Sequence, residues 1–198
     1  MLDIIGPPIS MPANGARFFN TLEESLLQPI GVFQFAWDRL DPFLFNSSFN
    51  ESLILHDTNY YTGVANNLTQ VNIPTLSYIN QVLKNLTLQS LIIEIGCGQG
   101  ELVEHLVING FNAIGFDPAL QLPNHYLHKS LYDPGHKTNL PVGLFILRCV
   151  LPHIREPWEY LQALFYQNPD AKILIEYQRI EFMIKHKLWF NLGHSHVN

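Results

Sequence analysis

An acidic residue and three closely spaced glycines lie near the middle of the chain, where an apolar stretch passes into an amphipathic one. Residues 90–106 read SLIIEIGCGQGELVEHL, so Glu94 precedes glycines at positions 96, 98 and 100. A tight glycine turn between a buried strand and a helix lets a ligand approach the backbone closely. The following helix presents free N–H groups at the same point. The stretch therefore predicts a site for a small polar ligand.

A second acid, Asp117, ends the apolar stretch NAIGFD that comes next. A carboxylate at the tip of a second strand can accept both hydroxyls of an adenosine ribose. The G-x-G-x-G spacing differs from the G-x-G-x-x-G of dinucleotide sites, and an acid beside the loop would repel a pyrophosphate. The pattern favours a ligand with cationic groups. The alternative is a structural turn in which Glu94 is only a buried acid paired with a backbone amide.

The elements that must position these acids follow from hydrophobic patterning. Helical periodicity occurs in residues 74–86, 100–110 and 155–167, the last with Trp158, Leu161, Leu164 and Phe165 on its expected inner face. Alternation of strands with helices predicts a Rossmann-like α/β fold, a parallel sheet with helices on both faces. The last strand is expected at an edge that residues 178–198 or a second subunit would cover. Strands are expected at 91–96, 111–117, 125–132, 143–150 and 171–177.

The first 72 residues have weak periodicity, many prolines and several aromatic residues, so we expect an irregular N-terminal arm or subdomain that packs on the rest. Residues 73–198 are expected to form the ligand-binding domain.

Composition limits the class of protein. A chain of 198 residues with 47% hydrophobic and 14% charged residues is expected to fold around a core. Its net charge of -6, without a Lys/Arg stripe, argues against nucleic acid as a partner. No apolar run has membrane-spanning length, and no secretory signal is recognisable, so a cytoplasmic location is expected. Cys97 and Cys149 do not indicate a disulfide framework, and no cluster of ligand residues indicates a metal.

The motifs EIGCGQG at 94–100 and GFDP at 115–118 resemble motif I and the acidic ribose loop of class I S-adenosylmethionine-dependent methyltransferases. The resemblance implies that the glycine loop wraps the methionine portion of the cofactor, Glu94 supports its amino-acid end and Asp117 holds the ribose. It places Leu131 and Tyr132 near the adenine. The full set of cofactor-binding residues that we expect is Glu94, Gly96, Cys97, Gly98, Gly100, Asp117, Pro118, Leu131, Tyr132 and Arg148.

A narrower resemblance is to sugar C-methyltransferases. Its motifs are MPANGARFF at 11–19, HDTNYY at 56–61 and FILRCVLPHIREPWEYLQAL at 145–164. At 193–196 the chain reads GHSH where that family has Tyr-His-Glu-His, so Gly193 and Ser195 depart from the pattern. The family's four-cysteine zinc site is excluded here, because no cysteine precedes Cys97. The resemblance also implies a C-terminally shortened fold. The catalytic candidates that follow are His194, His196 and His153.

Three functions remain open at this point. The first is a methyltransferase that uses S-adenosylmethionine to methylate a small-molecule acceptor, with carbon methylation of a nucleotide-linked sugar as the finer version. The second is an O- or N-methyltransferase of another metabolite. The third is a truncated, non-catalytic protein that binds the cofactor or a partner. A homodimer through the fifth-strand edge or the N-terminal arm is a further expectation.

Overall fold

The computed structural model describes residues 2–15, 17–39, 44–55, 73–85, 89–177, 179–187, 193, 194 and 197. The chain divides into two compact units. The first contains Met1–Tyr61, Leu151–Arg155 and Gln178–Asn198, and the second contains Thr62–Val150 and Glu156–Tyr177. The first unit thus includes two segments that the sequence pattern assigns to the ligand-binding domain. None of the described helices is long and apolar enough to cross a membrane.

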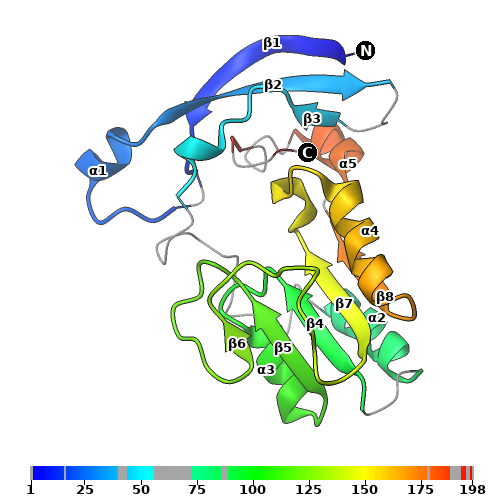
Figure 1. The fold of residues 1–198 in the computed structure, drawn as a ribbon. Helices are drawn as coiled ribbons and strands as arrows, with labels where there is room; N and C mark the ends of the chain where they lie inside the picture. The colour runs from blue at the N-terminus through cyan, green and yellow to red at the C-terminus, as the bar shows by residue number, and fades with distance from the viewer. Residues whose placement is uncertain are drawn as a thin grey trace. The chain divides into compact units, whose positions relative to one another are not determined.

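The second unit is built on a parallel sheet (Figure 1), as the sequence predicts. The strands follow one another in space as β6-β5-β4-β7-β8, with β4 at the centre. The third predicted strand, β6, is only two residues long. Turns limit it at both ends, since Asn124 Oδ1 accepts the amides of Tyr126 and Leu127, and Ser130 N donates to His128 O. The strands are β4 Leu91–Ile95, β5 Asn112–Phe116, β6 Leu127–His128, β7 Val142–Arg148 and β8 Lys172–Glu176.

Helices pack on both faces of this sheet. On one face, α2 (Ile73–Leu83) and α3 (Glu101–Ile108) share an apolar cluster with inward residues of β4 and β7. On the other face lies α4 (Pro157–Gln167), whose Tyr160 hydroxyl donates to the backbone oxygen of Tyr132; the Tyr132 ring in turn contacts Phe145. The predicted inner face of α4 is wrong in two positions. Leu164 is fully buried, but Trp158 and Phe165 are 49% and 48% exposed.

Strand β8 lies at an edge of the sheet, as expected. Its register with β7 runs from Leu144↔Lys172 to Arg148↔Glu176, and its Ile175 is 44% exposed. None of the described residues after 177 adds a strand to this edge. That residues 178–198 or a second subunit cover this edge stays a prediction. A homodimer through the edge also stays a prediction.

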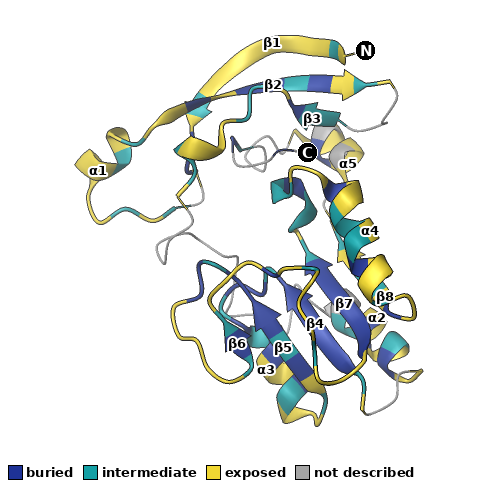
Figure 2. Cartoon of the chain, in the orientation of Figure 1, coloured by how far each residue is buried: buried dark blue, intermediate teal, exposed yellow. Residues whose placement is uncertain are grey.

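The first unit contains a three-stranded antiparallel sheet that was not expected from the sequence. Strands β1 (Leu2–Pro12), β2 (Ile30–Asp38) and β3 (Leu44–Asn46) follow one another in that order. Gly6, Pro7 and Pro8 interrupt the alternation of β1, and its register with β2 shifts between Ile5 and Ile9. Most of β1 is exposed (Figure 2). The unit also contains helices α1 (Leu22–Leu26) and α5 (Ile180–His186), and two 3₁₀ helices, Glu51–Leu53 and Leu151–His153.

Candidate functional site

The glycine loop joins the carboxyl end of β4 to the start of α3. Gly96, Gly98 and Gly100 have positive φ angles of 70°, 62° and 95°, a conformation that other residues adopt only with strain. Space is also restricted, because a Cβ on Gly96 would overlap Cγ2 of Val150 and one on Gly100 would lie 2.5 Å from Cδ1 of Leu127. The loop is anchored to β5, since Gly96 N and Cys97 N both donate to Phe116 O. The sequence therefore folds into a tight turn that requires glycine at these positions.

Asp117 and Gln99 connect this loop to the loop that follows β5. The buried carboxylate of Asp117 accepts the amide of Gly98 at 2.9 Å and the amide of Ala119 at 2.7 Å. The Gln99 side chain donates to Ala119 O at 3.3 Å and accepts the amide of Gln121 at 3.0 Å. The structure thus brings the glycine loop and the predicted ribose-binding acid together. The two hydrogen bonds of the Gln99 side chain were not predicted. The sequence signal for Gln99 is its place between Gly98 and Gly100.

Glu94 and Arg148 form an ion pair across adjacent strands. Arg148 Nε donates to Glu94 Oε1 at 2.8 Å; the Glu94 side chain is fully buried, and that of Arg148 is 19% exposed. The second oxygen, Glu94 Oε2, is buried and has no hydrogen-bond partner among the described residues. A buried carboxylate oxygen normally has a partner, so an unpaired one indicates a place for a donor from outside the chain. The alternative expectation, in which Glu94 pairs with a backbone amide, is not what the structure shows.

Burial raises the pKa of Glu94 to about 7, although the charge and hydrogen bond of Arg148 lower it. The negative charges of Glu101 and Asp117 contribute to the same raised value. The group is therefore poised near neutrality, and a cation beside Oε2 would favour its ionised form. Helix α3 begins at Gly100 without a side-chain cap and carries Glu101 and Glu104 in its first turn. The free N–H groups would by themselves favour an anion, whereas the carboxylates of Glu101 and Glu104 disfavour one.

Cys97 and Pro118 lie within the two loops. The Cys97 side chain is buried, and its Sγ would lie 2.8 Å from a Cβ built on Gly115. Burial raises the pKa of the Cys97 thiol, so it stays protonated and fills space between the loop and β5. Pro118 follows Asp117 in the turn and is half-buried. We expect Cys97 and Pro118 to contribute to cofactor binding by shaping the backbone of the two loops.

Leu131 and Tyr132, the expected adenine neighbours, differ from each other. Leu131 is 79% exposed, whereas Tyr132 is buried. The Tyr132 ring contacts Phe116 and Phe145, on the face of the sheet that carries α4. Tyr132 is thus part of the packing beneath α4, and its place near the adenine stays a prediction.

The catalytic candidates belong to the first unit. The His194 ring is buried, with Nδ1 2.9 Å from Val32 O and Nε2 3.2 Å from Asn50 N, and it stacks on Phe49. A Cβ on Gly31 would overlap the ring. His194 therefore has a structural part in this unit, and its catalytic role gains no support. His153 is half-buried in a 3₁₀ helix, and His196 lies outside the described residues, as does the HDTNYY motif.

Glu176 lies near this ion pair and, like Gln99, was not predicted as a site residue. It ends β8, is the register partner of Arg148, and its backbone oxygen accepts the amide of Cys149 at 2.9 Å. Its sequence signal was its position at the end of the last predicted strand. The carboxyl ends of β4, β7 and β8 thus carry Glu94, Arg148 and Glu176 side by side in strand order.

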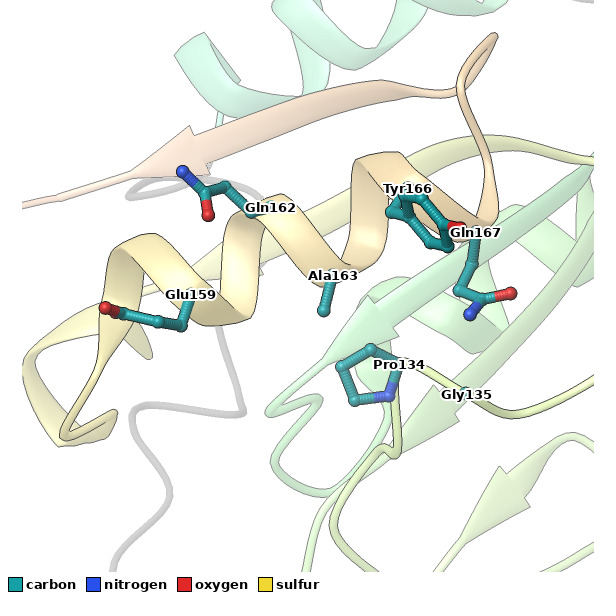
Figure 3. Close-up of a pocket in the computed structure, with 7 residues that line it drawn as sticks. All are labelled: Pro134, Gly135, Glu159, Gln162, Ala163, Tyr166 and Gln167. Carbon is teal, nitrogen blue, oxygen red and sulfur yellow. The ribbon is translucent and has the colours of Figure 1, made fainter.

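A separate depression of about 390 Å³ lies between α4 and the loop after β6 (Figure 3). It contains neither the glycine loop nor the two acids, so we do not assign it to the cofactor. The residues that line it are Pro134, Gly135, Glu159, Gln162, Ala163, Tyr166 and Gln167.

The described residues fit the amino-acid end of S-adenosylmethionine. Its ammonium group is a donor of the kind that Glu94 Oε2 lacks. Asp117 lies at the end of β5, where a ribose would be expected.

Comparison with known proteins places the chain in a family. A family model described as "Methyltransferase domain" matches residues 68–197, which is more than half of the chain. No curated protein matches the chain.

Proposed function

Because the chain belongs to the methyltransferase-domain family, we propose that it transfers the methyl group of S-adenosylmethionine to a small-molecule acceptor. The observation that carries this proposal is the buried Glu94 carboxylate with one oxygen unpaired beside the glycine loop. Glu94 would receive the ammonium group of the cofactor, the glycine loop would surround its methionine portion, and Asp117 would hold its ribose.

The cofactor supplies a methyl group that is already activated as a sulfonium. The protein then has mainly to exclude water and align the acceptor, and positioning of this kind can contribute roughly 7–11 kcal/mol to lowering a barrier. The described residues of the site suit that task, because the loops at 96–100 and 117–121 are joined by hydrogen bonds through Asp117 and Gln99.

A nucleotide-linked sugar is the acceptor that we propose first, on the resemblance of residues 145–164 to sugar C-methyltransferases. Methylation at carbon requires a base that removes a proton. Both ring nitrogens of His194 are engaged by backbone groups, which favours the second candidate, an O- or N-methyltransferase of a small metabolite.

Calorimetric titration of S-adenosylmethionine at pH 8 tests the proposal. We expect Glu94→Gln and Asp117→Asn each to weaken binding by about 10- to 100-fold, since each removes a charge-assisted hydrogen bond worth about 1.5–3 kcal/mol. Asp170→Asn, the same change at an exposed position, should leave the affinity unchanged.

Absence of binding to the folded wild-type protein, or variants that bind as tightly as wild type, would contradict the proposal. If binding is found, transfer of a labelled methyl group to keto-sugar nucleotides, and then to hydroxyl and amine acceptors, distinguishes the two acceptor classes.

A further inference from the structure

The ion pair between Glu94 and Arg148 uses only half of the carboxylate. The two residues lie 54 positions apart in the chain and meet because β4 and β7 are neighbours in the sheet. One guanidinium nitrogen holds Oε1, while Oε2 is buried without a partner among the described residues. The Glu94 side chain has no exposed surface, so a ligand reaches Oε2 only when neighbouring atoms move aside.

We propose that Arg148 is a positioning residue that holds Glu94 by one oxygen and keeps the other available to a cation, so that binding of S-adenosylmethionine expels a proton from Glu94. The inference rests on the proposed function and adds to it a coupling between cofactor binding and pH. The proton passes to solvent, and the ammonium group of the cofactor takes its place as the second partner of the carboxylate.

The charges around Glu94 explain why it should carry a proton before the cation binds. Burial raises the pKa of Glu94 to about 7, and Glu101 on α3 and Asp117 after β5 raise it as well. Arg148 on β7 is the cation that lowers it, and Arg148 itself faces Glu176 on β8. The Cys97 thiol, whose pKa is raised by burial, contributes no charge. Acidic groups therefore outnumber basic ones here, and a second cation is needed to hold Glu94 ionised.

Arg148 has two effects in this arrangement. Its charge keeps the ionised form of Glu94 within reach near neutral pH, and its hydrogen bond fixes which oxygen stays available. Without Arg148, the carboxyl group would be protonated over a wider pH range and free to turn. A lysine at this position keeps the charge but lacks the planar fork of donors, so it should restore only part of the effect.

The first measurement is the proton balance of binding. S-Adenosylmethionine is titrated into the whole chain at pH 6 in two buffers that differ in ionisation enthalpy. At that pH Glu94 should be about nine-tenths protonated, while the amino group of the ligand is already charged. We expect release of close to one proton per cofactor bound by the wild-type protein, and loss of that release in Glu94→Gln.

The second measurement separates positioning from a general structural effect. In Arg148→Met we expect binding at pH 6 to weaken more than tenfold and the pH of half-maximal binding to rise by about one unit or more; Arg148→Lys should show a smaller rise. Arg148→Met added to Glu94→Gln should weaken binding by less than about threefold further, because Arg148 acts through Glu94. Arg179→Met, the same change at an exposed arginine, should leave the pH profile unchanged.

Two results would overturn the inference and leave the proposed function standing. One is binding of S-adenosylmethionine by the wild-type protein with the same proton balance as Glu94→Gln. The other is an Arg148→Met protein that remains folded and binds with an unchanged pH profile. If the folded wild-type protein does not bind the cofactor even at pH 8, the proposed function fails, and this inference fails with it.

Discussion

Two buried ionisable side chains, one in each unit, differ in whether all their hydrogen-bonding atoms have partners. His194 is 1% exposed and Glu94 is fully buried. Because Val32 O can only accept, Nδ1 of His194 carries the hydrogen, and Nε2 accepts the amide of Asn50. Both ring nitrogens are therefore satisfied. Glu94 has a partner for one oxygen and none among the described residues for the other.

The contrast shows that burial alone does not identify a functional residue. A ring nitrogen makes one hydrogen bond, so a buried histidine with both nitrogens paired stabilises the fold and has no capacity left for a ligand. A buried group that keeps an unpaired atom weakens the fold, and a ligand can recover that loss. In this chain the first description applies to the histidine that the sequence motif nominates as a base, and the second applies to the acid before the glycine loop.

The largest expected effect is the loss of stability that His194→Ala causes in the first unit. The change removes two partly buried hydrogen bonds to backbone and opens a cavity beside Phe49, so we expect the free energy of unfolding to fall by roughly 3–4 kcal/mol. Urea unfolding measures it, with the exposed His125→Ala as control. A His194→Ala protein of normal stability that binds S-adenosylmethionine but transfers no methyl group would instead support the catalytic role.

The second-largest expected effect is the pH dependence that Glu94 gives to the free energy of unfolding. Its pKa in the folded chain is about 7 against an ordinary value of 4.5, so the folded state holds the proton more tightly than the unfolded state. The resulting stabilisation is complete below pH 4.5 and is lost as the pH rises through 7. We expect a loss of about 3 kcal/mol in the free energy of unfolding between pH 4.5 and 8.

The control is Glu94→Gln, which cannot ionise and should remove this part of the pH dependence. Unfolding curves at several pH values measure both proteins. Parallel dependences on pH would show that Glu94 has an ordinary pKa and that the contrast with His194 is smaller than described.

The smallest effect compares the two glycines at the ends of α3. Gly100 and Gly110 both have positive φ angles, 95° and 85°, but only at Gly100 would a Cβ meet another side chain, Leu127. We expect Gly110→Ala to cost about 1 kcal/mol for the left-handed conformation alone, and Gly100→Ala to cost about 2 kcal/mol. Urea unfolding gives the difference. Equal costs would mean that Leu127 moves aside freely, and that the loop is less tightly packed than its geometry indicates.

Most of the second unit could be predicted from sequence because its signals are local. The apolar runs that form β4 and β7 are buried along nearly their whole length, as expected for strands covered on both faces, β5 and β8 carry shorter apolar runs, and the glycines mark the turn. Strand β6 was predicted too long, since the turn hydrogen bonds of Asn124 carry no hydrophobic signal. The antiparallel sheet of the first unit was missed because Pro7 and Pro8 break the alternation of β1.

The partners of the site residues depend on non-local geometry. Both Glu94 and Arg148 could be placed at the carboxyl ends of strands, but their contact depends on the strand order and on which side of the sheet each faces. His194 meets Asn50 across 144 positions of the chain. No periodicity reports such a contact, so Glu94, Asp117 and Arg148 could be assigned to the site from sequence, but the pairing of Arg148 with Glu94 could not.

Strand β1 has a consequence for how copies of this chain behave when crowded. It is an edge strand of the first unit's sheet, and Leu2, Ile4 and Ile9 are about half exposed along it. Such an edge usually invites another chain to extend the sheet by backbone pairing. Pro7 and Pro8 have no N–H to offer, and they lie in the middle of the strand, where the register with β2 is already broken. The prolines that conceal this strand in the sequence thus also protect it from aggregation through its edge.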